Sequence, residues 1–189
     1  MNKYNPNIHH RRSVRLKGYD YSQEGLYFIT ICTQNRICLF CEITVGANGI
    51  RPKMQLNEMG KIVETEWKKS AEIRSEIQNH DFIVMPNHFH AIVEIVPIVG
   101  AYGIRPVETI EMGVCHTPLR TPSKTIGALV RGFKSSVTKR LGYSPWQRNY
   151  HEHIIRNQNS YETISQYIKN NPEKWANDMF FQKTDGKNY

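Results

Sequence analysis

The chain has 189 residues, of which 39% are hydrophobic and 22% are charged. These proportions are typical of a globular protein with a buried core, and they exclude a wholly disordered chain. Lysine and arginine outnumber aspartate and glutamate by 25 to 17, which gives a net charge of +8. Such a surplus favours a polyanionic partner, nucleic acid or an anionic membrane, although a merely basic protein fits it equally well.

The sequence indicates neither a targeting segment nor a disulfide framework. No apolar run approaches the ~20 residues that a membrane-spanning helix needs, and the basic N-terminus has no apolar stretch of the kind that secretory signals carry. We therefore expect a cytoplasmic protein without a membrane partner. The four cysteines are too irregularly spaced for a disulfide framework. Cys38 and Cys41 have the spacing of zinc ligands but no second pair, so reduced thiols are the better interpretation.

The distribution of charge and glycine predicts the domain limits. We expect a basic N-terminal arm over residues 1–20, one domain over 21–175 and a tail over 176–189. The arm has no acidic residue before Asp20, and such a run is either solvated or follows a phosphate backbone. Two similar stretches, VGANGIRP and VGAYGIRP (45–52 and 99–106), contain glycine and are interpreted as loop insertions without chemistry.

The first half of the domain alternates strand and helix patterns. Residues 25–33 and 37–43 are rich in β-branched and aromatic side chains on either side of a short polar break, which predicts a β-hairpin. Apolar residues at helical spacing predict a helix over 57–78. Residues 81–85 and 89–96 then follow as two strands joined at Pro86-Asn87.

The second half contains two more helices and one strand. A helix over 122–141 begins with good start signals, Thr121 and Pro122. A strand over 149–156 precedes a last helix over 157–171, which Asn157 caps and Pro172 ends. The order β-β-α-β-β-α-β-α predicts an α+β, ferredoxin-like sandwich, with an antiparallel sheet of four to five strands and the helices packed on one face.

Two histidines stand inside the apolar run DFIVMPNHFHAIVEIV (81–96). His88 and His90 leave one face of a strand about 6–7 Å apart, close enough for both imidazoles to hold one metal ion. The alternative is a pair of buried histidines with ordinary hydrogen-bond partners, and the spacing leaves both open. His151 and His153 repeat the pattern in a more polar strand, where a polar face is the simpler interpretation.

Tyr161 begins the apolar stripe of the last helix, which continues through Ile164 and Ile168. It is either the first member of a core stripe, or its hydroxyl emerges at the end of that stripe and faces the histidine strand. A phenol is a poor nucleophile unless its target is polarised or a base lies beside it. A divalent cation held by two histidines would polarise a phosphodiester in this way.

Two segments resemble a known family. MPNHFHAIVEI (85–95) resembles the histidine–hydrophobe–histidine (HUH) motif of single-strand DNA transposases, and residues 146–175 resemble the C-terminal signature of REP-associated tyrosine transposases. The resemblance implies cleavage and rejoining of hairpin-forming single-stranded DNA through a 5′-phosphotyrosine. It implies Tyr161 as nucleophile, with His88 and His90 as ligands of Mg²⁺ or Mn²⁺. Tyr150 and Tyr167 are nearby alternatives, but neither aligns with the tyrosine of the family. Relatives often offer a third ligand about a turn after the tyrosine, where this chain has Ser165 and Gln166, so either of them, or none, is expected to bind.

The expected partner is single-stranded or hairpin DNA, bound by a monomer or a homodimer that associates with the nucleoid. Basic side chains of the arm and of the second helix are the predicted DNA contacts: Arg11, Arg12, Arg15, Lys124, Arg131, Lys134, Lys139 and Arg140. Two other functions stay open. One is a non-catalytic nucleic-acid-binding module, a domesticated transposase, and the other is a hydrolase that uses metal-bound water instead of a tyrosine.

Overall fold

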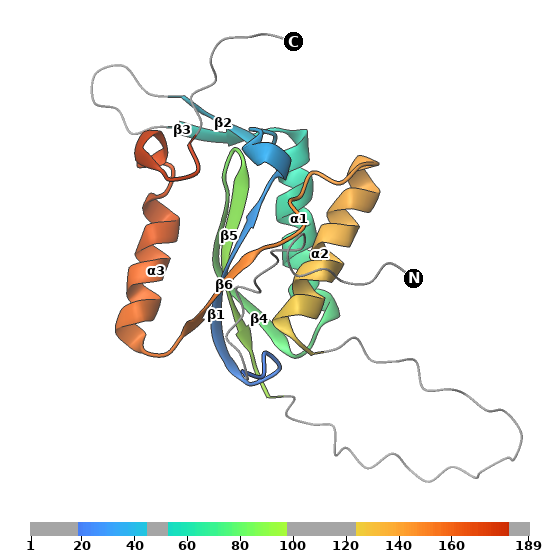
Figure 1. The fold of residues 1–189 in the computed structure, drawn as a ribbon, viewed down its shortest axis with the longest axis vertical. Coiled ribbons are helices and arrows are strands. Elements are labelled where there is room, and N and C mark those ends of the chain that lie inside the picture. Colours follow the sequence, from blue (N-terminus) through green and yellow to red (C-terminus); the bar gives the residue numbers. More distant parts are fainter. Residues whose placement is uncertain (1–18, 45–52, 98–123, 182–189) are drawn as a thin grey trace, which may run out of the picture.

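The fold is a four-stranded antiparallel sheet with helices on both sides, seen in a computed structural model (Figure 1). Residues 19–44, 53–97 and 124–181 are described. The sheet has the order β4-β5-β1-β6 and is antiparallel at every pairing. Its strands are β1 (Gly25–Cys32), β4 (Ile77–Val84), β5 (His88–Ile95) and β6 (His151–Ile155). This topology is that of a ferredoxin-like sandwich, and it confirms the predicted fold class.

Two helices, α1 (Glu58–Ile73) and α2 (Ile126–Leu141), pack side by side on one face of the sheet (Figure 1). Between them and the sheet lies the main core, in which the Phe89 ring contacts Trp67 and Phe133. The third helix, α3 (Gln158–Asn170), covers the opposite face through a smaller cluster around Ile92 and Ile168. The helices were predicted on a single face; α3 instead crosses to the face that the even-numbered residues of β5 occupy.

The predicted hairpin between residues 25–33 and 37–43 is wrong. Strand β1 already has β5 and β6 as neighbours, so no edge is left for the next segment to pair with. A short 3₁₀ helix, η1 (Gln34–Arg36), follows β1 instead. Strand β2 (Cys41–Thr44) then pairs with β3 (Lys53–Leu56) in a separate two-stranded sheet.

Each helix begins at a polar cap, as its sequence requires. The side chains of Asn57, Thr125 and Asn157 accept hydrogen bonds from backbone N–H groups three residues later. Asn157 was predicted to cap the last helix, and it does. Helix α2 begins at Ile126 rather than 122, and the predicted start signals Thr121 and Pro122 lie outside the described residues.

Helix α1 ends at Ile73, five residues earlier than predicted, because the chain turns at Arg74 and enters β4 at Ile77. The two loops that share the VGA-GIRP pattern, most of the predicted arm and the last residues of the predicted tail also lie outside the described residues. No helix in the described ranges is both long enough and apolar enough to cross a membrane.

Candidate active site

His88 and His90 leave β5 on the face that α3 covers, and both are buried, with 0% and 1% of their surface exposed. Their ring centroids are 4.4 Å apart. Their alternation along the strand sends Phe89 into the main core on the other face. The sequence therefore placed the pair on the correct strand, with both imidazoles on one side.

Asn87 fixes the orientation and the tautomer of His88. Its side-chain oxygen lies 2.9 Å from His88 Nδ1, and an amide oxygen can only accept, so Nδ1 carries the proton. His88 Nε2 therefore carries no proton and presents a lone pair. This buried atom has no hydrogen-bond partner within the described part of the chain. Burial, with the charge of Arg36, lowers the pKa of His88 to about 3, so the ring is neutral at physiological pH.

His90 is held by a hydroxyl group at each ring nitrogen. Its Nδ1 lies 2.8 Å from the hydroxyl of Thr30 on β1, and its Nε2 lies 3.2 Å from the hydroxyl of Tyr167 on α3. Burial, followed by the charges of His88 and His151, lowers its pKa well below the ordinary value. His88 therefore anchors Nδ1 on the protein and presents an unprotonated Nε2, as is typical of histidines that bind metals, whereas both ring nitrogens of His90 lie against hydroxyl groups.

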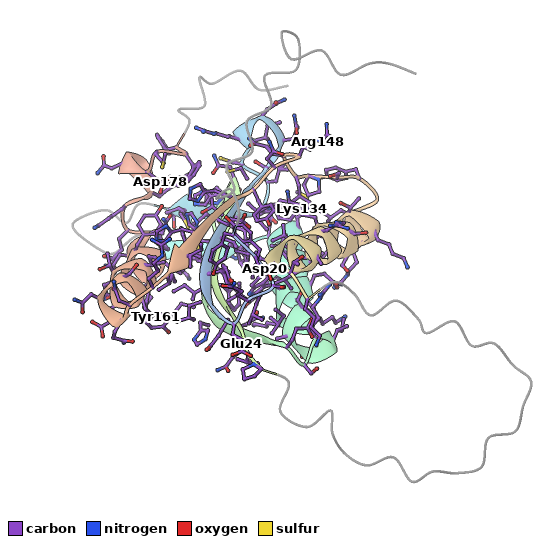
Figure 2. The ribbon with its side chains drawn as sticks, turned by 60° about the horizontal axis from the view of Figure 1, so that its bottom comes forward. Asp20, Glu24, Lys134, Arg148, Tyr161 and Asp178 are labelled. Atoms are coloured by element: carbon purple, nitrogen blue, oxygen red, sulfur yellow. The ribbon has the colours of Figure 1, made fainter. Side chains whose placement is uncertain are left out.

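Asn171 and Asp178 complete the cluster around the Tyr167 hydroxyl. Asn171 follows Tyr167 by one helical turn and is 1% exposed, and its side-chain oxygen is a second buried atom without a partner among the described residues. Its amide nitrogen donates to Asp178 at 3.4 Å, and the Tyr167 hydroxyl donates to the same carboxylate oxygen at 3.5 Å. Asp178 lies beyond the end of α3, as Figure 2 shows.

These donors fit a divalent cation. A tightly bound metal usually has three or more charged or imidazole ligands, and no group of three His, Cys, Asp or Glu side chains in the described ranges is placed to hold one. The cluster instead offers two neutral imidazole nitrogens and, close by, one amide oxygen, of which His88 Nε2 and Asn171 Oδ1 lack partners. Such a mixed N/O set could hold a divalent cation whose remaining ligands come from water or from phosphate.

Tyr161, the predicted nucleophile, lies outside this cluster. It stands in the first turn of α3 (Figure 2), where its hydroxyl is 3.4 Å from Nδ1 of His80 on β4. His80 Nε2 in turn contacts Glu94 at 2.8 Å. Glu94 is four residues beyond His90 on β5, or roughly 13 Å along the strand. The structure therefore does not bring Tyr161 into one pocket with both histidines, and the phenol that contacts His90 is that of Tyr167.

The predicted third ligands are likewise directed elsewhere. The Ser165 hydroxyl donates to Asp81 on β4 at 2.6 Å and accepts from Lys169, so it ties α3 to the edge of the sheet. Gln166 is exposed on the helix surface. Asn171, and neither of these two residues, belongs to the cluster around the Tyr167 hydroxyl. The spacing Tyr-x-x-x-Asn was a usable signal, because residues i and i+4 share a helix face.

Most of the predicted DNA contacts on α2 are separated from the histidine pair by the sheet. Lys124, which precedes α2, and Arg131, Lys139 and Arg140 on the helix are exposed, and Arg140 pairs with Glu66 on α1. Lys134 is directed inward, where its ammonium donates to the carbonyl oxygens of Gln147 and Asn149 at 2.8 and 3.1 Å. It therefore stabilises the loop before β6. The arm residues Arg11, Arg12 and Arg15 lie outside the described residues.

The segment after α3 packs on the histidine pair. The Phe180 ring lies 4.7 Å from the His88 ring, and Trp175 in η3 (Trp175–Asn177) lies 5.9 Å from it. Asn87 also donates to the Phe180 carbonyl at 2.8 Å. Residues 176–181 belong to the predicted tail, yet they form one wall of the site. No sequence pattern indicated this contact.

Comparison with known proteins identifies a relative and a fold. No family model matches the sequence. A Haemophilus influenzae protein, described only as uncharacterized, is 42% identical over 184 residues, which cover 95% of this chain and 97% of that protein. The chain belongs to the family of that protein. Among solved structures, a REP-associated tyrosine transposase bound to a REP hairpin is similar, with a TM-score of 0.53 and 19% identity, over 87% of this chain and 74% of that one. The chain shares the fold of that transposase.

Proposed function

We propose that this protein is a DNA strand transferase that cleaves and rejoins hairpin-forming single-stranded DNA, with Tyr167 as its nucleophile. The observation that carries the proposal is the position of the Tyr167 hydroxyl, 3.2 Å from His90 Nε2 and beside two buried acceptor atoms without partners. The sequence resemblance and the shared fold support a transposase. The similar solved transposase is bound to a REP hairpin, which suggests the class of substrate.

In the proposed reaction the Tyr167 oxygen forms a bond to phosphorus and the bond between phosphorus and the 3′ oxygen breaks. The products are a 5′-phosphotyrosine and a free 3′-hydroxyl: the phenol proton passes to solvent, and the leaving 3′ oxygen takes up a proton from solvent. Because the phosphotyrosine keeps the energy of the ester, a 3′-hydroxyl can attack it and join two strands without ATP. The same site therefore serves for cleavage and for rejoining.

Tyr167 needs help to react as a phenolate. Burial, with the charge of Asp178, raises its pKa, so the protein alone stabilises the protonated phenol. Mg²⁺ or Mn²⁺ bound by His88, His90 and Asn171 would supply the positive charge that favours the phenolate and offsets charge on the phosphate. Asn87 holds the His88 imidazole in the tautomer that a metal ligand requires, Thr30 positions the His90 ring, and the Asp178 carboxylate orients the Asn171 amide.

The decisive experiment is an adduct assay with matched tyrosine variants. A 3′-labelled hairpin oligonucleotide is incubated with Mn²⁺, and the protein-linked label is resolved on a denaturing gel. We expect adduct from the wild type and from Tyr161→Phe, and none from Tyr167→Phe or in EDTA. Adduct formation that survives in Tyr167→Phe and disappears in Tyr161→Phe would return the nucleophile to residue 161, and would require α3 to shift along the sheet.

The same assay separates the other two functions. Tight hairpin binding in EDTA with no adduct from any substrate would identify a non-catalytic nucleic-acid-binding module. Multiple turnover to a free 5′-phosphate, unaffected by Tyr167→Phe, would identify a hydrolase that uses water. Gel filtration of the protein with and without the hairpin distinguishes a monomer from a homodimer.

A further inference from the structure

Arg36 extends the proposed site beyond the histidine pair. It is the last residue of η1, the short 3₁₀ helix that follows β1. Its backbone carbonyl accepts a hydrogen bond from Asn87 at 3.0 Å, and Asn87 also holds His88. One buried amide side chain therefore links the turn that carries Arg36 to the histidine strand.

The backbone of this turn is strained and firmly held. Asn35 and Arg36 have φ angles of 54° and 56°, in the left-handed region that residues other than glycine seldom adopt. Hydrogen bonds from the Thr33 hydroxyl to the carbonyls of Ile37 and Asn87 close the turn, at 2.8 and 3.0 Å. A backbone conformation of this kind persists only where its surroundings enforce it, so the direction in which Arg36 leaves the turn is fixed.

The guanidinium of Arg36 and the ring of His88 both contact the ring of Phe180. The guanidinium stacks 5.2 Å from the centre of the Phe180 ring, whose own centre is 4.7 Å from that of His88. Its one direct polar contact among the described residues is a long hydrogen bond, 3.4 Å, to the Met179 carbonyl. Stacking and a single long bond leave most of its five N–H donors available.

Two other arginines in the described ranges pair with carboxylates, and Arg131, Arg148 and Arg156 are exposed on the surface. Arg74 pairs with Glu76 at 3.4 Å and Arg140 with Glu66 at 3.0 Å. No carboxylate within the described ranges lies within ion-pair distance of Arg36, which is half-buried. A half-buried guanidinium without a carboxylate, held beside a cluster of neutral metal-binding groups, is placed to receive an anion from outside the protein.

We propose that Arg36 binds a backbone phosphate of the single-stranded DNA next to the histidine pair, and so sets which phosphodiester meets Tyr167. This inference rests on the proposed function, because it names a contact for the same substrate. A planar guanidinium can bond two phosphate oxygens at once, which fixes the position of the strand as well as its affinity. Lysine at this position would keep the charge but not the paired geometry.

The test measures whether the contribution of Arg36 to binding affinity depends on the charge of one particular phosphate. Hairpin oligonucleotides that each carry one uncharged methylphosphonate are titrated against Tyr167→Phe protein in EDTA, with and without Arg36→Ala. We expect Arg36→Ala to weaken binding of the charged hairpin about ten-fold or more. A methylphosphonate at one phosphate next to the cleavage position should by itself cause most of this loss of affinity in the protein with Arg36. In Arg36→Ala protein the same methylphosphonate should weaken binding little further. Arg36→Lys should recover only part of the affinity.

Lys61→Ala on α1 is the charge-matched control, because Lys61 makes only an exposed ion pair with Glu58.

The outcomes separate this inference from the proposed function. Additive losses at every phosphate would overturn the assignment of Arg36 even if the wild type forms the expected adduct. Coupling at one phosphate without any adduct from the wild type would support Arg36 and overturn the strand-transfer chemistry. A protein that binds none of the hairpins would overturn both. Melting temperatures of the variants, which should match that of their parent, exclude a loss of fold as the cause.

Discussion

The hydroxyl of Tyr167 lies 3.2 Å from Nε2 of His90, a contact that joins the last turn of α3 to the first half of β5. Tyr161, six residues earlier, contacts His80 instead. Six residues correspond to about 9 Å along a helix, so the two phenols serve different parts of the sheet face. The position of α3 along β5 therefore decides which of the two phenols reaches the histidines.

Asn171 is predicted to contribute to cation binding. Asn171→Ala should weaken the binding of Mn²⁺, measured by calorimetry, about ten-fold or more, because an outer-shell change alone typically costs at least that much. Asn171→Asp should strengthen it, since a carboxylate is a better ligand for a hard divalent cation than an amide. Equal affinities in all three proteins would remove Asn171 from the site and leave the histidine pair as the whole of it.

Asn87 is predicted to support both stability and the site. Asn87→Ala would leave His88 Nδ1 and the carbonyls of Arg36 and Phe180 without their partner. Each unsatisfied buried group costs about 1–3 kcal/mol, so urea unfolding should show a loss of several kcal/mol, and Mn²⁺ affinity should also fall. Asn79→Ala is the matched control, because Asn79 donates only to the Trp67 carbonyl. It should cost less and leave Mn²⁺ affinity unchanged. Equal effects of the two substitutions on Mn²⁺ binding would contradict the role of Asn87.

The sequence predicted the elements whose patterns are long and periodic. The three helices and the two central strands follow from apolar spacing and from caps such as Asn157, because burial of one face dictates which residues repeat. The prediction of a β-hairpin was wrong for a reason that the local pattern does not contain. Both strands that pair with β1, namely β5 and β6, come from distant parts of the chain. Local alternation identifies a strand but not its neighbours.

The site was predictable in part. The histidine pair follows from strand geometry, since residues two apart share a face whatever else the fold does. Tyr161 and Tyr167 could not be separated in the same way, because both lie on α3 and only the packing of the helix along β5 decides between them. Asp178 comes from a segment without a periodic pattern, and nothing in its local sequence indicated that the chain turns back onto the histidines.

Lys134 is predicted to be a structural residue, although its position in a basic helix suggested DNA binding. Its ammonium holds the loop at 147–149, so Lys134→Met should lower the melting temperature. The dependence of DNA affinity on salt should stay as in the wild type, because the slope counts only the phosphates that the protein neutralises. Lys139→Met, an exposed neighbour on the same helix, should leave the melting temperature unchanged. A reduced salt slope in Lys134→Met at unchanged stability would show that the ammonium turns outward to DNA.

Asp81 is predicted to make the docking of α3 sensitive to acid. Burial raises the pKa of Asp81, but hydrogen bonds from Ser165 and Lys169 outweigh this effect and leave the pKa below its usual value near 3.8. A carboxyl group with a lowered pKa stabilises the fold fully above its unfolded pKa, and this contribution is lost as the pH falls through the folded pKa.

Ser165→Ala removes one of the two donors, so the free energy of unfolding should fall less between pH 5 and pH 3 in this variant than in the wild type. Thr163→Ala, whose hydroxyl donates only to the Asn159 carbonyl, should keep the wild-type slope. All other carboxyl groups are shared by the three proteins, so the difference in slope isolates Asp81, and parallel slopes for Ser165→Ala and the wild type would show that this contact does not hold α3 on the sheet.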